Sequence, residues 1–147
     1  MVPQAWVGEV WWGMRPAWPR NVWIGTTIED QTAMDERIVP LLMLPAPRRF
    51  LSMEPLLGPV DMGQALSGAR PPFFQTASWV IVGGESGPGH RPLNLEHATN
   101  VVEQCETAGV PVWFKQVGGR TPTAGGDRLN ARLIQQRPEP HRPEANQ

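Results

Sequence analysis

A short apolar run that ends in glycines, WVIVGGESGP over Trp79–Pro88, constrains the fold of this chain most strongly. The run lacks the alternation of a half-exposed strand, which is typical of a strand buried on both faces of a parallel sheet. The glycines after it allow a sharp turn or the close approach of a ligand to the backbone. Glu85 is therefore expected at the carboxyl end of a buried strand, where α/β sheets and barrels bind ligands.

Three further segments repeat this construction, so the sequence predicts four strands that each deliver an ionisable group at the same end. These segments are Val22–Thr27, followed by Glu29; Arg49–Met53, followed by Glu54; and Val110–Phe114, followed by Lys115 and Gln116. Lys115 is the only lysine among the 13 Lys and Arg residues of the chain. The pattern indicates a functional site, but it does not by itself indicate a reaction.

The segment after the first predicted strand shows the periodicity of a helix. Its apolar residues recur at the spacing of one helical face, at Met34, Ile38, Leu41 and Leu42. Thr32 and Asp35 give a weak capping-box signal at the start of this helix. Pro40 is expected to kink the helix or to divide it at Val39, because proline removes one helical hydrogen bond and clashes with the preceding turn.

A second helix is expected over Leu95–Ala108, after the third predicted strand. Asn94 is a plausible N-cap, and Gly109 supplies the left-handed residue that ends such a helix. Cys105 falls on the apolar face of this helix. We therefore interpret Cys105 as a small buried hydrophobic residue and not as a nucleophile or a metal ligand.

The order of these elements predicts an α/β fold of parallel βα units with right-handed crossovers, over residues 21–119. Four such units make about half of a TIM-type barrel. The long crossover Leu56–Ser78 is rich in glycine and proline and is expected to hold one short helix near Val60–Leu66. A half barrel has two open edges and apolar faces without partners, so the strands either form an open sheet or are completed by another chain.

The two ends of the chain differ in composition from its centre. Residues 1–20 form a lead-in segment in which tryptophans lie among glycines and prolines, at Trp6, Trp11, Trp12 and Trp18. We expect these rings to cover an apolar edge, although a surface that stacks bases or sugars is the alternative. Residues 120–147 are expected to be flexible, with one short element over Asp127–Gln136 and disorder from Pro138. A chain that opens in this way is expected to start partway through a larger fold.

Composition excludes several classes of function. A net charge of −1 argues against a general polyanion binder, although it leaves nucleic-acid binding by a local arginine patch open. The chain has no apolar run long enough to span a membrane, and its start does not resemble a secretory signal, so a cytoplasmic protein is expected. The single cysteine excludes an internal disulfide and an all-cysteine metal site within this chain.

The predicted strand ends, with Glu29, Glu54, Glu85 and Lys115, are compatible with four kinds of chemistry. Three carboxylates suit a hard divalent cation, and two can share the roles of acid and base. A desolvated lysine can act as a base or form a Schiff base, and the whole group can clamp a polar cofactor. In the structural alternative, each charge pairs with an arginine such as Arg91. The glycine-rich GGESGPG lacks the spacing of a phosphate-binding loop, and the histidines lack metal-ligand spacing.

Four blocks in this order, NVWIGTTIEDQ, RRFLSMEPLLGPVD, WVIVGGESGPGHRP and GVPVWFKQVGG, resemble the carboxyl half of the phage gene-product 37/68 family. This family is a domain of unknown function described as radical-SAM-like, and the resemblance covers about Pro19 to Gly119. It implies a TIM-type barrel with S-adenosylmethionine over the strand ends. It also implies an iron–sulfur cluster held by a cysteine-rich segment of the amino half, which this chain lacks.

The resemblance also implies roles for particular residues. Glu54 and Lys115 are the catalytic candidates. The cofactor-binding candidates are Glu29, Gly83, Gly84, Glu85 and Gln116, and no metal ligand is expected within this chain. The missing half of the barrel would come from a partner chain, or the chain would associate with itself.

Three functional hypotheses follow from the sequence. In the first hypothesis, the chain is the carboxyl half of a radical-SAM-like phage enzyme. It is truncated or split from the segment that holds the cysteines, and it is inactive by itself. Alternatively, it is a stand-alone hydrolase or lyase that uses its carboxylates with a divalent metal. The third hypothesis is a non-catalytic remnant or interaction module.

Overall fold

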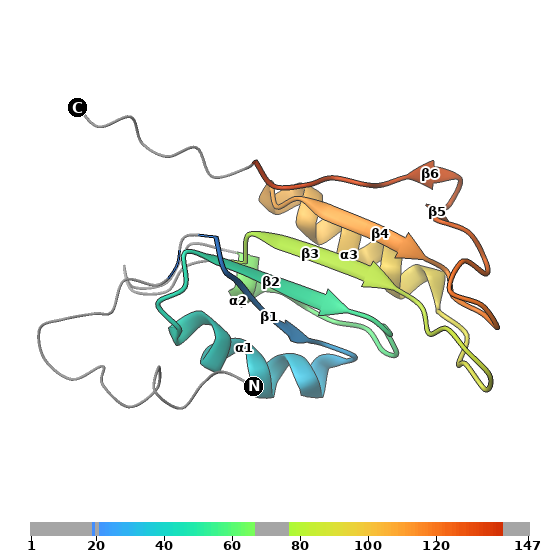
Figure 1. Ribbon diagram of the computed structural model, residues 1–147, viewed down its shortest axis with the longest axis horizontal. Helices are drawn as coiled ribbons and strands as arrows, with labels where there is room; N and C mark the ends of the chain where they lie inside the picture. Colours follow the sequence, from blue (N-terminus) through green and yellow to red (C-terminus); the bar gives the residue numbers. More distant parts are fainter. Residues whose placement is uncertain (1–18, 20, 67–76, 140–147) are drawn as a thin grey trace, which may run out of the picture.

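The computed structural model describes residues 19, 21–66 and 77–139, which form a mixed α/β structure around a parallel sheet (Figure 1). The sheet has the order β1-β2-β3-β4, with strands β1 (Trp23–Thr27), β2 (Arg48–Met53), β3 (Trp79–Gly83) and β4 (Val112–Gln116). The helices are α1 (Gln31–Met43), α2 (Gly63–Leu66) and α3 (Leu95–Ala108), and a hairpin of β5 (Arg128–Leu129) and β6 (Arg132–Leu133) follows β4. The predicted α/β class and the parallel βα units are confirmed, with strand limits shifted by two residues at most.

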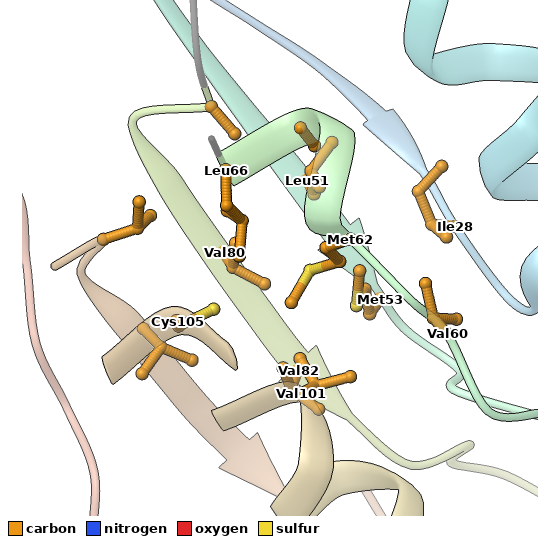
Figure 2. Close-up of a cluster of buried hydrophobic side chains, with 14 of the residues drawn as sticks. Ile28, Leu51, Met53, Val60, Met62, Leu66, Val80, Val82, Val101 and Cys105 are labelled. Atoms are coloured by element: carbon orange, nitrogen blue, oxygen red, sulfur yellow. The ribbon is translucent and has the colours of Figure 1, made fainter. Parts of the chain in front are cut away.

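The helices cover one face of the sheet. Residues in register across the central strands, such as Leu51, Val80 and Val112, are all fully buried. Figure 2 shows the labelled side chains of this layer meeting those of α2, α3 and the loop before α2, with Val60, Met62 and Val101 among them. Because alternate residues of a strand face opposite sides, the other set of side chains lies on a second face without a described helix.

This second face carries a row of aromatic rings. The ring of Trp79 lies 6.1 Å from that of Trp23, 6.5 Å from that of Phe50 and 6.5 Å from that of Trp113, so the row spans all four strands. Trp79 and Ile81 are only partly buried. The expectation that β3 is buried on both faces is therefore not met, because the described helices pack on one side only.

Helix α1 begins two residues earlier than the capping-box signal indicated. Asp30 is the N-cap, and its Oδ1 accepts a hydrogen bond of 2.9 Å from the backbone N–H of Ala33. Pro40 lies inside α1, which continues to Met43, so the expected division of the helix at Val39 is wrong. Pro40 is exposed, and the helix continues through it without the hydrogen bond that an N–H at this position would make to the carbonyl of Glu36.

A buried arginine closes the carboxyl end of α1. Arg49 is 2% exposed, and its Nε donates a hydrogen bond of 3.1 Å to the carbonyl oxygen of Leu41. Its Nη2 donates to the carbonyl of Leu44. Burial lowers the pKa of the Arg49 guanidinium. The side chain supplies donors to carbonyls at the end of the helix, of which that of Leu41 also accepts from the N–H of Leu44 at 3.2 Å. The sequence did not predict this role of Arg49.

Helix α3 forms as predicted. Asn94 is its N-cap and accepts from the N–H of Glu96, and Gly109 ends it with φ of 68°. Cys105 is fully buried, and this burial, with a smaller effect of Glu106, raises the pKa of its thiol to about 12. The interpretation of Cys105 as a core residue is confirmed. The short helix expected near Val60–Leu66 is confirmed as α2, the rest of the crossover up to residue 76 lying outside the described residues.

The predicted final element, Asp127–Gln136, packs back onto the sheet. After the β5–β6 hairpin, the chain runs antiparallel to β4, where Phe114 N–H donates to Ile134 (2.8 Å) and Gln136 N–H donates to Val112 (3.0 Å). The β4 edge is therefore paired, whereas a half barrel was expected to have two open edges. The predicted tryptophan-rich lead-in up to Trp18 and the tail from residue 140 lie outside the described residues.

Candidate functional site

A cavity of about 400 Å³ lies at the carboxyl ends of β2, β3 and β4. Its lining consists of Ser52, Glu54, Pro55, Gly84, Glu85, Ser86, Lys115 and Gln116. We call this the strand-end cavity. Five of the seven predicted site residues thus line one cavity, because parallel strands bring their carboxyl ends to the same edge of the sheet.

Glu54 and Lys115 form an ion pair across this cavity. Glu54 Oε2 lies 2.7 Å from Lys115 Nζ, and the two side chains are 16% and 53% exposed. The pair joins the ends of β2 and β4, which are separated in the sheet by β3. Gly83 lies beside this pair, and a Cβ atom there would be in ordinary contact with Glu54, 3.4 Å from its Cγ and Oε2. Gly83 does not line the strand-end cavity, and its role in binding stays a prediction.

Glu85 is held by a different cation. Its Oε2 accepts hydrogen bonds of 2.8 Å from the backbone N–H and from the Nε of Arg91, and its Oε1 accepts one of 3.0 Å from Nη2. These hydrogen bonds from Arg91 lower the pKa of the Glu85 carboxyl to about 2. Glu85 is consequently an anion at any physiological pH and closes the loop between β3 and α3.

Glu29 does not line the strand-end cavity. Its Oε2 pairs with Arg37 Nη1 at 2.7 Å, and the same nitrogen donates to the carbonyl oxygen of Thr27. The carbonyl oxygen of Glu29 accepts from the N–H groups of Leu57 and Gly58. Glu29 therefore ties the end of β1 to α1 and to the loop after β2.

Backbone contacts fix the exits of β3 and β4. Gly84 N–H donates to the carbonyl of Gln116 at 2.9 Å, and a Cβ atom at Gly84 would lie 1.8 Å from the carbonyl oxygen of Val117. Gln116 Nε2 donates to Ser86 Oγ at 2.7 Å. Ser52 and Ser86 were not predicted to line the cavity. Ser52 could have been found, because strand alternation puts it on the same side as Glu54.

The chemistry of this cavity suits a polar ligand that carries both a positive and a negative group. It presents two carboxylates, one ammonium group, two hydroxyls and a side-chain amide within one space. Within the described residues, no group of three His, Cys, Asp or Glu side chains is arranged to hold a metal ion. The single cysteine of the chain lies in the core, so these residues do not fit an iron–sulfur cluster.

Fold and cavity together define a mixed α/β protein with a polar site at the ends of its parallel strands. A family described as "Protein of unknown function (DUF5131)" matches residues 3–138, and the chain belongs to this family. Comparisons with curated proteins and with solved structures give no match. None of the helices in the described part of the chain has the length and apolar character of a membrane span.

Proposed function

We propose that this chain is the ligand-binding part of a radical-SAM-like protein of phage type, and that S-adenosylmethionine binds in the strand-end cavity. The observation that supports this most directly is the convergence of Glu54, Glu85 and Lys115 on one cavity. The resemblance of the sequence blocks around these residues supplies the identity of the cofactor. The parallel sheet with its helices on one face then corresponds to a section of a TIM-type barrel.

The residues of the cavity match the groups of this cofactor. Glu54 and Glu85 suit its ammonium group and its ribose hydroxyls, and Lys115 suits its carboxylate. When bound, S-adenosylmethionine would supply an activated sulfonium centre. The Glu54–Lys115 pair, at 2.7 Å, can hold or pass a proton at Lys115 Nζ. Glu85 stays charged because Arg91 holds it, and it therefore acts as a fixed anion.

The cluster of such a protein would have to come from cysteines outside this chain. A partner that adds strands to the sheet would meet β1, because the edge of β4 is paired with residues 134–136. Among the described residues, β1 pairs only with β2. We therefore propose that the remaining strands of the barrel join at β1, from another chain or by self-association.

Calorimetric titration of the purified chain with S-adenosylmethionine tests the cofactor proposal. We expect saturable binding that weakens at least about tenfold in Glu54→Gln and in Lys115→Met, since each change leaves the other charge without its partner. Glu106→Gln is the matched control, because it breaks an exposed ion pair with Arg132, at 2.8 Å, that does not line the cavity. Equal affinity in all three variants, or no binding to the unaltered chain, would overturn the proposal.

Titration with Mg²⁺ or Mn²⁺ separates the stand-alone metal enzyme from this proposal. Thermal stabilisation by either ion that disappears in Glu54→Gln and Glu85→Gln would favour hydrolase or lyase chemistry instead. Absence of both metal and cofactor responses would favour the interaction module.

A further inference from the structure

A second cavity of about 510 Å³ lies beside the strand-end cavity. Its lining consists of Trp113, Lys115, Gln116, Pro122, Thr123, Gly126, Asp127 and Gln135. We call this the Trp113 cavity. Lys115 and Gln116 line both cavities, so the single lysine of the chain stands between two adjacent spaces.

The two spaces differ in character. The strand-end cavity has no aromatic lining residue, whereas the Trp113 cavity has an indole, with polar groups from Asp127 and Gln135. Gln135 Nε2 lies 3.4 Å from Asp127 Oδ2. An indole beside a carboxylate and an amide is suited to a flat ring with polar hydrogens at its edge.

The walls of the Trp113 cavity are anchored to the sheet. The guanidinium of Arg137 lies 4.7 Å from the centre of the Trp113 ring, and the ring of Trp79 meets it edge-on. Val117 N–H donates to the carbonyl of Gly126 at 2.9 Å, which docks the loop after β4. Gly125 in that loop approaches Val117 so closely that a Cβ atom would lie 2.6 Å from Val117 Cβ. Trp113 and Gln116 anchor the cavity to the sheet, whereas most of its other lining residues, such as Pro122 and Asp127, are exposed, so it is open to solvent.

We propose that the Trp113 cavity binds a planar heteroaromatic base that carries ring N–H or amino donors, as a molecule separate from the cofactor. The proposal rests on the proposed function, for which it names the substrate class. The ring packs against Trp113, and Asp127 accepts hydrogen bonds from its edge. Lys115 then lies between the two ligands and is the group that can reach a polar atom of either.

The test uses the whole chain and two probes, adenosine and guanosine, with binding followed by NMR of the indole N–H signals and by calorimetry. We expect at least one probe to shift the Trp113 signal, and Trp113→Leu to weaken its binding about tenfold or more, as for loss of a stacked ring. Trp23→Leu is the matched control. Trp23 lies on the same face, contacts Trp79 at 6.1 Å and carries Arg48 over its ring at 5.1 Å, but it does not line the cavity.

Two further variants keep the result interpretable. Trp113→Phe keeps an aromatic ring at this position. We expect it to bind the base more tightly than Trp113→Leu does. If the leucine variant does not fold, we expect the phenylalanine variant to retain binding. Asp127→Asn should weaken binding with the fold intact. Equal losses in Trp23→Leu and Trp113→Leu, or binding of neither probe, would overturn the proposal. Competition between bound guanosine and S-adenosylmethionine would also overturn it, because the two would then share one space.

The two proposals fail in distinguishable ways. Loss of cofactor binding in Glu54→Gln with retained binding of the base would leave the second ligand in place. If S-adenosylmethionine does not bind at all while a base does, the proposed function is wrong, but the proposal that the Trp113 cavity binds a base is retained.

Discussion

Two carboxylates at neighbouring strand ends have acquired different partners. Glu54 reaches across Gly83 to Lys115, while Glu85 turns to Arg91 in its own loop. The sequence allowed both residues to be placed at one edge of the sheet, because strand ends are a local pattern. The alternative in which each carboxylate pairs with an arginine such as Arg91 holds for Glu85, whereas the partner of Glu54 is Lys115, which comes from β4 and has no local signal near Glu54.

The Glu85–Arg91 contact predicts the behaviour of the protein in acid. We expect the Glu85 carboxyl to titrate at about 2, below its ordinary 4.5, so the stability that it contributes is complete above about pH 4.5 and lost toward pH 2. In Arg91→Gln its pKa should move upward but stay below 4.5, because the backbone N–H of residue 91 still donates. NMR of the side-chain carboxyl carbons measures both values.

Arg132→Gln is the control for this titration, because it removes an exposed cation that pairs with Glu106. It should leave the midpoint of Glu85 unchanged. An Arg91→Gln variant with the midpoint still at about 2 would show that the guanidinium is not the cause.

At the scale of elements, close backbone contacts between β3 and β4 continue past the paired residues of the two strands. The register shifts between Val82 and Gly83, and Gly83 pairs with Gln116. Gly84 then lies against the backbone of Val117. The sequence indicated that these glycines would permit a close approach, and it named a ligand as one candidate. For Gly84, the approaching group is the neighbouring strand.

This contact predicts that two adjacent substitutions differ in how much they destabilise the protein. Gly84→Ala should lower the free energy of unfolding by about 2 kcal/mol or more, because its Cβ atom would lie 1.8 Å from the Val117 carbonyl oxygen. Gly83→Ala should change it by less than about 1 kcal/mol, since its Cβ contacts begin at 3.4 Å. Urea unfolding followed by circular dichroism compares the two, and equal losses would contradict the packing described here.

For the whole molecule, local sequence signals predicted the helices and strands, but they did not predict the contacts between segments that are distant in the sequence. Gly109 and Asn94 were identified because caps act within a few residues. The burial of Arg49 depends on the end of α1, and the pairing of residues 134–136 with β4 depends on a chain reversal after the hairpin. Neither has a periodic signature. The same holds for the Trp113 cavity, whose walls come from β4 and from the loop and strand that follow it.

The two edges of the sheet should differ in amide hydrogen exchange. Ile28 N–H donates to Ser52, so by alternation the N–H groups of Gly25 and Thr27 point away from β2. We expect these two amides to exchange rapidly, and those of Phe114 and Gln136, which bond across the other edge, to be protected. Exchange measured by NMR on the free chain decides this. Strong protection of Gly25 and Thr27 would show that the β1 edge is covered.

The place of Lys115 between two cavities has a practical consequence, because the chain contains no second lysine. Apart from the terminal amine, a reagent that acylates primary amines has one target, and that target faces the places where ligands are proposed to bind. Covalent labelling followed by mass spectrometry thus reads occupancy directly, without engineering a tag. Lys115 is therefore a natural chemical probe of ligand binding at both cavities.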